Sequence, residues 1–413
     1  MSHRLLRQLL KQALSMSQTG TLTIVEPDGT RVRCGTGEPE AELHMRSEAV
    51  WPALLHGSLG LADAYASGLW ESPDLVALVR LAARAMPALD RARELSIPVI
   101  RPFQLLRSVA RPSGPLQRRR DIAAHYDLGN ELFSQLLDPT LTYSCALFRE
   151  PGMSLEEAQL AKLERVCDVL GLGRGDRVLE IGSGWGSFAL HAATTRGCHV
   201  TTTTISREQH RHVRERVQRE GLGELVTVLD QDYRELGGRY DRLVSIEMIE
   251  AVGWRSFGPF LHHCSGLLEP DGAMLLQAIT IDDRAYTVEK ASRSFIKEYI
   301  FPGGALPSVS VLARALARHT DLRFLDLEDL SDHYPETLRR WRTNLAENAP
   351  RLHELGYDER FHRIWTLYLA YCEAGFIEGR IGDVQILLGK PQFRLGNGRR
   401  DDLQCLVDVE RAA

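Results

Sequence analysis

The alternation of apolar and polar segments from about residue 160 onward predicts a series of short strands and helices. Five apolar runs have the length of strands: 176–184, 199–206, 225–232, 240–248 and 272–280. Three intervening segments have helical spacing: 185–196, 207–221 and 258–268. Strands that alternate with helices of this length predict an α/β fold, with a doubly wound, mostly parallel sheet covered by helices on both faces. Ligands of such sheets bind at the carboxyl ends of the strands.

The first hundred residues have a different pattern. Residues 4–14 have helical spacing with basic residues on one side, and 21–35 predict a hairpin that turns at 27–29. Helical spacing follows to about residue 94. We therefore expect three parts: a smaller α+β amino-terminal domain (1–105), a basic linker (106–120) and the domain that holds the parallel sheet (121–395).

Length and composition set limits on the kind of protein. The chain has 413 residues, 44% of them hydrophobic and 25% charged, which is typical of a globular protein with two domains. It contains no apolar run of the roughly 18 residues that a membrane span requires, and its start does not resemble a secretion signal. The seven cysteines form no C-x-x-C pair, so neither a metal site nor a disulfide framework is expected. These features predict a cytoplasmic protein.

The charge is uneven around the expected linker. No acidic residue occurs from Leu95 to Arg120, whereas six arginines do: Arg101, Arg107, Arg111, Arg118, Arg119 and Arg120. This segment is either a solvated linker or a patch that attracts anionic phospholipid head groups or nucleic acid. Few aromatic residues lie among these arginines, so stacking on bases, and with it nucleic-acid binding, is not expected.

A glycine-rich turn follows the first strand of the alternating region. The sequence VLEIGSGWGSFAL (178–190) places Glu180 at the end of the strand and Gly182 and Gly184 in the turn. A dinucleotide site would have an acid about 20 residues later, where this chain has TTTTIS, and the lysine of a phosphate-binding loop is also absent. A ligand with a cationic centre near Glu180 fits better, and S-adenosylmethionine is such a ligand. The alternative is that Glu180 caps the next helix.

Eight segments, in order, resemble the cyclopropane fatty acid synthase family of S-adenosylmethionine enzymes. They are 125–148, 179–186, 203–209, 231–234, 244–253, 295–308, 333–341 and 361–376. The family acts on alkenes in phospholipid or mycolate acyl chains. The resemblance implies a class I methyltransferase (Rossmann-like) fold for the domain at 121–395, and a lipid- or membrane-docking role for the domain at 1–105.

The resemblance also implies which residues bind the cofactor. Two of them would approach its methionine part (Tyr143, Ser144), two the ribose (Thr204, Gln209) and two the adenine (Asp232, Tyr233). The complete set of expected cofactor residues is Tyr143, Ser144, Glu180, Gly182, Ser183, Gly184, Thr204, Ile205, Gln209, Asp232 and Tyr233.

The family binds a bicarbonate ion that removes a proton, and the matching ligands here are Cys145, Glu250, the backbone of Ile279, and Tyr334. Glu250 would orient the ion and accept its proton in turn. Two positions depart from the family pattern, because Gln277 and Ala251 stand where histidines are usual. Glutamine donates a hydrogen bond but does not titrate near neutral pH, so Gln277 is included in the expected catalytic set.

Four aromatic residues are candidates for stabilising a carbocation: Tyr143, Tyr299, Phe301 and Tyr334. For Phe301, core packing is the better interpretation. The leading hypothesis is one-carbon transfer from S-adenosylmethionine to the double bond of an unsaturated acyl chain in a membrane phospholipid, by an enzyme peripheral to the inner face of the membrane. A homodimer is part of this hypothesis. The product is either a cyclopropane ring or a methylene or methyl branch. The other hypotheses are N- or O-methylation of a soluble molecule, and a non-catalytic lipid-binding protein.

Overall fold

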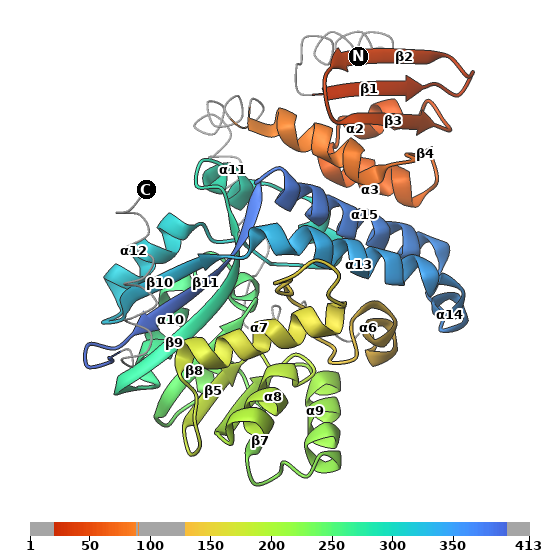
Figure 1. Ribbon diagram of the computed structural model, residues 1–413. Coiled ribbons are helices and arrows are strands. Elements are labelled where there is room, and N and C mark those ends of the chain that lie inside the picture. Colours follow the sequence, from red (N-terminus) through yellow and green to blue (C-terminus); the bar gives the residue numbers. More distant parts are fainter. Residues whose placement is uncertain (1–19, 88–89, 91–128, 395–413) are drawn as a thin grey trace.

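The computed structural model of the chain describes residues 20–87, 90 and 129–394 (Figure 1). The predicted helix at 4–14 and the basic linker at 106–120, with its arginines, lie outside the described residues. The domain boundaries proposed from the sequence therefore remain predictions.

A seven-stranded sheet forms the centre of the larger unit, with the strand order β10-β11-β9-β8-β5-β6-β7. Its first five strands along the chain are parallel and confirm the strands predicted from the sequence: β5 (Arg177–Ile181), β6 (His199–Thr204), β7 (Val226–Asp230), β8 (Tyr240–Ile246) and β9 (Leu268–Ile281). Two further strands, β10 (Arg323–Asp329) and β11 (Ile381–Gly389), extend it in antiparallel fashion beside β9. The expected doubly wound, mostly parallel sheet is confirmed.

Helices cover both faces of this sheet, because alternate strand residues point to opposite sides. Val178 packs with the helices α7 (Leu155–Leu170), α8 (Ser187–Arg196) and α9 (Arg207–Arg219). The next residue, Leu179, packs with α10 (Phe257–Gly266) and α12 (Val309–His319) on the other face. Both residues are completely buried. The two faces thus have separate apolar cores on either side of β5.

A third apolar cluster lies beyond the carboxyl ends of the parallel strands. It contains residues of α6 (Asn130–Leu136), α13 (Tyr334–Glu347), α14 (Ala349–Glu354) and α15 (Glu359–Ile377). Shorter elements complete this region: η1 (Tyr233–Glu235), η2 (Ile249–Val252), α11 (Tyr286–Ala291), the π-helix η3 (Ile296–Ile300) and η4 (Ser331–His333). Of these elements, η1 and η2 follow the carboxyl ends of β7 and β8, at the edge of the sheet where ligands are expected.

The amino-terminal unit is a four-stranded sheet in the order β2-β1-β3-β4. Its strands are β1 (Gly20–Val25), β2 (Arg31–Thr36), β3 (Glu40–Met45) and β4 (Trp70–Glu71), and its helices are α2 (Val50–Leu54), α3 (Gly57–Ala66) and residues 75–87. The antiparallel pairing of β1 with β2 confirms the predicted hairpin. The unit packs against α15 (Figure 1), where Arg80 and Arg84 both pair with Glu378 at 2.7 and 2.6 Å. In the part of the chain described, no helix is long and apolar enough to cross a membrane.

Candidate active site

A pocket at the carboxyl ends of β5, β6 and β8 holds the predicted cofactor residues. It measures about 1240 Å³, including the space at its mouth, and all eleven residues expected to bind the cofactor line it. They come from four separate parts of the sequence. The structure thus brings the predicted set together, and their individual contacts with the cofactor remain predictions.

The glycine turn allows the backbone to approach the pocket. Gly182 has φ +97°, and a Cβ placed on it would lie 3.0 Å from Cγ of Met248, so a side chain there would be strained and would displace Met248. The backbone N–H groups of Gly182 and Ser183 donate to Thr203 O at 3.1 and 2.9 Å, which ties the turn to β6. Helix α8 begins at Gly186 without a side-chain cap. The alternative role of Glu180 as a helix cap is therefore not what the structure shows.

Glu180 lies on the floor of this pocket. Its carboxyl group is buried and accepts a hydrogen bond from the Thr202 hydroxyl at 2.5 Å. Burial raises the pKa of Glu180 to about 8, against smaller opposing effects of the Thr202 hydrogen bond and the Lys162 charge. A cationic ligand would stabilise the ionised form of this acid. The site is therefore suited to the positively charged end of S-adenosylmethionine.

This arrangement predicts pH-dependent cofactor binding. Below a pH of about 8 the free protein holds the Glu180 proton, which a cationic ligand must displace. We expect affinity for S-adenosylmethionine to rise by up to about tenfold per pH unit towards pH 8 and then to level off. Calorimetry in buffers of different ionisation enthalpy should detect proton release on binding at pH 7. A Glu180→Gln variant that retained the same proton release would contradict this account.

On the predicted ribose and adenine sides, the polar groups are held by their neighbours. Thr204 donates its hydroxyl to Gln209 Oε1 at 2.8 Å. The Asp232 carboxylate is bound by Arg234 through Nε at 2.8 Å and Nη2 at 2.6 Å. Both pairs line the pocket, so their side chains are fixed before a ligand enters.

A second acid in the pocket, Glu247, was not predicted from the sequence. Its carboxylate accepts hydrogen bonds from the Cys145 backbone N–H at 2.8 Å, Gln277 Nε2 at 2.9 Å and the Tyr334 hydroxyl at 2.5 Å. Glu247 follows β8 directly and has φ +48°, a conformation that non-glycine residues rarely adopt and that is concentrated at functional sites. The sequence did carry a signal, because Glu247 follows its strand much as Glu180 ends β5.

Glu250, the acid predicted to act in catalysis, lies in η2. Its Oε1 accepts the Ile279 backbone N–H at 2.6 Å, whereas Oε2 is buried without a hydrogen-bond partner. Burial, followed by the nearby Glu247 charge, raises the pKa of Glu250 to about 8. Glu250 is thus mainly protonated at neutral pH.

The donors of the expected catalytic set are divided between these two acids. Cys145, Gln277 and Tyr334 direct their donors at Glu247, and Ile279 directs its donor at Glu250. The Cys145 thiol itself faces backbone oxygens, and burial raises its pKa well above the usual range. Because the donors already bind carboxylates, the described residues do not fit a bicarbonate ion at this place.

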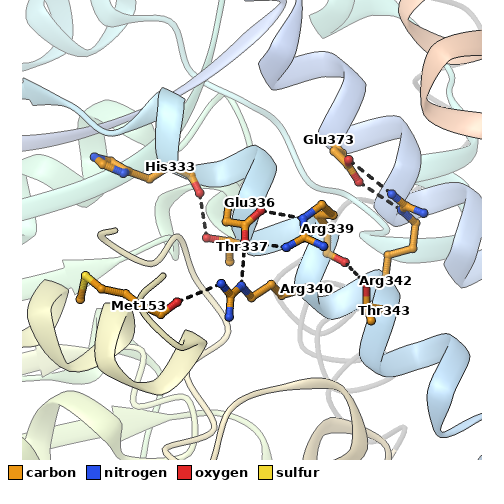
Figure 2. Close-up of polar contacts among 9 residues, drawn as sticks. All are labelled: Met153, His333, Glu336, Thr337, Arg339, Arg340, Arg342, Thr343 and Glu373. Atoms are coloured by element: carbon orange, nitrogen blue, oxygen red, sulfur yellow. Dashed lines mark hydrogen bonds and ion pairs between the residues drawn. The ribbon is translucent and has the colours of Figure 1, made fainter. Parts of the chain in front are cut away.

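Helix α13 positions Tyr334 at its first turn. Figure 2 shows how the helix is held: Glu336 binds Arg339 and Arg340, and Arg342 pairs with Glu373 of α15 at 3.1 Å. The Arg340 guanidinium also donates to the Met153 carbonyl at 2.9 Å. The helix is therefore anchored on both sides, and the Tyr334 hydroxyl reaches Glu247 from a fixed backbone.

The four aromatic candidates differ in position. Tyr143 lines the pocket, and its hydroxyl bonds to that of Tyr368 at 2.8 Å. Tyr334 stacks on Phe376 at 4.3 Å, and Phe301 packs edge-on against Tyr368. Tyr299 is 40% exposed and donates to Asp63 of the amino-terminal unit. The structure therefore removes Tyr299 from the set that could face a cation in the site.

Lys162 is another residue that the sequence did not reveal. It lies within α7, is completely buried, and donates from Nζ to the Ser144 hydroxyl at 2.7 Å on the pocket wall. No other lysine or arginine of the described residues is buried. Its ammonium group provides a compensating charge for the two acids Glu180 and Glu247.

The sheet order, the glycine turn and the acid at the end of β5 define an S-adenosylmethionine-dependent methyltransferase of class I. Comparison with known proteins gives the family. Residues 115–386 match the family described as mycolic acid cyclopropane synthetase, and the chain belongs to it. It is thus a methyltransferase of the cyclopropane synthase type.

Several relatives support this assignment. The chain is 40% identical to tuberculostearic acid methyltransferase UfaA1 of Mycobacterium tuberculosis, over 87% of this chain and 85% of the relative. It is 35% identical to cyclopropane-fatty-acyl-phospholipid synthase of Escherichia coli, over 85% and 87% respectively. Among solved structures, the cyclopropane synthase MmaA2 from Mycobacterium tuberculosis superposes with a TM-score of 0.62 at 32% identity, covering 66% of this chain and 98% of that one. The mycolic acid cyclopropane synthase CmaA1, complexed with SAH and CTAB, has the same TM-score at 31% identity, with the same coverage.

Proposed function

We propose that the protein transfers a one-carbon unit from S-adenosylmethionine to the double bond of an unsaturated fatty acyl chain in a membrane phospholipid. The observation that carries this proposal is the position of Glu247. Its carboxylate lines the same pocket as the cofactor turn, and three donors hold it there. Methylation of a nitrogen or oxygen atom would not require a second, immobilised acid, whereas alkylation of an alkene must end in the loss of a proton from carbon.

The residues of the pocket supply what this chemistry needs. The bound cofactor supplies an electrophilic methyl group on a sulfonium, which leaves as a neutral thioether. The alkene electron pair forms the new carbon–carbon bond and leaves a carbocation on the acyl chain. Aromatic faces stabilise such a cation by roughly 0.5–2 kcal/mol each, and in this proposal the role belongs to Tyr143, which lines the pocket. The surrounding apolar cluster excludes water that would otherwise quench it.

Glu247 then accepts the proton. If the proton leaves the new methyl group and its C–H electron pair closes onto the cationic carbon, the product is a cyclopropane ring. If a hydride shift comes first, loss of a proton from the same methyl group gives an isomeric methylene branch. A saturated methyl branch would further require a hydride donor and a proton. Similarity to cyclopropane-fatty-acyl-phospholipid synthase favours the ring, and similarity to tuberculostearic acid methyltransferase UfaA1 favours the branch as a second candidate.

A phospholipid substrate implies that the enzyme works at a membrane surface. We propose a cytoplasmic protein that associates peripherally with the inner face of the membrane, through the amino-terminal domain and the arginines of residues 101–120. A homodimer is part of the same proposal. The relative from Escherichia coli carries the phospholipid substrate in its name, which supports this choice of acyl carrier.

The test is an assay with unsaturated phospholipid vesicles. We expect S-adenosylhomocysteine to form when the purified protein meets vesicles with monounsaturated chains, and not with fully saturated ones. Proton NMR of the extracted chains then distinguishes the isomers, because ring protons resonate upfield and vinylidene protons downfield. Product formation on a soluble amine, without any dependence on unsaturated lipid, would overturn the proposal.

A further inference from the structure

The Gln277 amide joins Glu247, which is half-buried, to the buried Asp383. Its Nε2 donates to Glu247 Oε1 at 2.9 Å and to Asp383 Oδ2 at 2.8 Å, and its own Oε1 accepts from Gln385 Nε2 at 3.0 Å. Gln277, Gln385 and Asp383 come from neighbouring strands. Gln277 of β9 lies directly opposite Gln385 of β11 in the antiparallel ladder. Asp383 lies two residues before Gln385 on β11, on the same face of the sheet.

This arrangement fixes the orientation of the Gln277 amide. Both N–H groups are used on carboxyl oxygens, and the carbonyl is used by Gln385. Rotating the amide by half a turn would place its oxygen against two acids and its N–H groups against another N–H donor. Gln277 and Asp383 are completely buried, so water cannot compensate for such a loss.

The number of hydrogen bonds distinguishes the three acids near this amide. Glu247 accepts three donors, whereas Asp383 Oδ1 and Glu250 Oε2 have none. A buried carboxylate oxygen without a donor is costly when charged, and one buried cation, Lys162, faces these acids.

The electrostatic environment agrees with this distinction. The titratable groups that act on Glu247 are Cys145, Lys162, Glu250, Tyr334 and Asp383. Burial raises the pKa of Asp383 well above its usual range, and the neighbouring acids raise it further. Burial also raises the pKa of Glu247, but the hydrogen bonds from Tyr334, Cys145 and Gln277 and the Lys162 charge oppose that rise.

We propose that Asp383, as a neutral carboxyl, and Gln385 are positioning residues that hold the Gln277 amide so that Glu247 faces the pocket as the ionised acid. The inference rests on the proposed function, because it assumes that Glu247 accepts the proton. The inference explains why Glu247, and not the adjacent Glu250 or Asp383, accepts the proton. Gln277, which replaces the histidine usual in the family, is the link through which Asp383 acts.

Two substitutions at Asp383 test the inference. Asp383→Leu removes the acceptor that holds Gln277, and we expect kcat to fall by about tenfold or more, because small misplacement of reacting groups costs rates of this order. Loss of a well-placed donor to Glu247 should also move the acid limb of the pH–rate profile to higher pH, while KM for S-adenosylmethionine stays within about twofold. Asp383→Asn, the conservative variant, keeps an oxygen for Gln277 and mimics the neutral carboxyl, so it should recover most of the rate and the original pH profile.

Gln277→Leu provides an independent measurement, and it should move the acid limb in the same direction as Asp383→Leu. Equal damage from Asp383→Asn and Asp383→Leu in folded, cofactor-binding protein would overturn the inference, and so would an unmoved acid limb in both leucine variants. Failure of the proposed function would look different. In that case Glu247→Gln itself would turn over at the wild-type rate, or the wild-type protein would form no product from unsaturated vesicles.

Discussion

Glu247→Gln is expected to lower the rate of product formation by roughly 10²–10⁴-fold, the range typical for loss of a general base. The amide cannot accept a proton from the alkylated chain. Its NH2 group would also face donors, since the carboxylate oxygens are bound by Tyr334, Cys145 and Gln277. The Gly182 turn and Glu180 are untouched, so affinity for S-adenosylmethionine should change by less than about threefold. Release of S-adenosylhomocysteine with unsaturated vesicles, together with calorimetric cofactor binding, measures both quantities.

Glu250→Gln is the matched control. The sequence predicts that this change abolishes turnover, because the resemblance assigns the handling of the proton to Glu250. The structure predicts a smaller loss: a glutamine oxygen can still accept the Ile279 N–H, and the carboxyl it replaces is mainly protonated at pH 7, with a pKa of about 8. Full activity in Glu247→Gln together with inactive Glu250→Gln would return the role to Glu250.

The parallel part of the fold could be predicted from the sequence because the spacing of apolar residues within each segment indicates whether it is a strand or a helix. Segments such as 176–184 and 207–221 have the spacing of a strand and a helix, and β5 and α9 form there. The antiparallel β10 and β11 were not predicted. Their place beside β9 depends on pairing between segments distant in sequence, and local periodicity does not report such pairing.

The cofactor pocket was predictable to a similar degree, because its residues lie in short segments next to strand ends. For the proton-accepting site, the family resemblance named Cys145, Gln277 and Tyr334 but not Glu247, because the convergence of their donors on this acid arises only through the fold. Lys162 was missed for another reason. A lysine within a helix usually points to solvent, and nothing in the local pattern of α7 indicates that this one is completely buried.

Gly182→Ala is expected to weaken S-adenosylmethionine binding by about a hundredfold. At φ +97° an alanine is strained by about 1–3 kcal/mol, and its Cβ would meet Met248 Cγ at 3.0 Å. The strain can be relieved by moving the turn or the Met248 side chain, and both line the pocket. A shift there changes the surface that receives the methionine end of the ligand, so the strain weakens binding as well as folding. Calorimetry of the purified variant measures the loss.

Gly356→Ala separates the effect of backbone strain on cofactor binding from its effect on folding stability. Gly356 has nearly the same φ, +94°, but a Cβ there would have no atom within 4 Å, and the residue is not part of the pocket lining. Both variants should lose similar thermal stability from backbone strain, whereas cofactor affinity should fall in Gly182→Ala alone. Wild-type affinity in Gly182→Ala would mean that the turn does not form the surface of the cofactor site. Equal losses of affinity in both variants would mean that the effect reflects general destabilisation, because Gly182 lines the pocket and Gly356 does not.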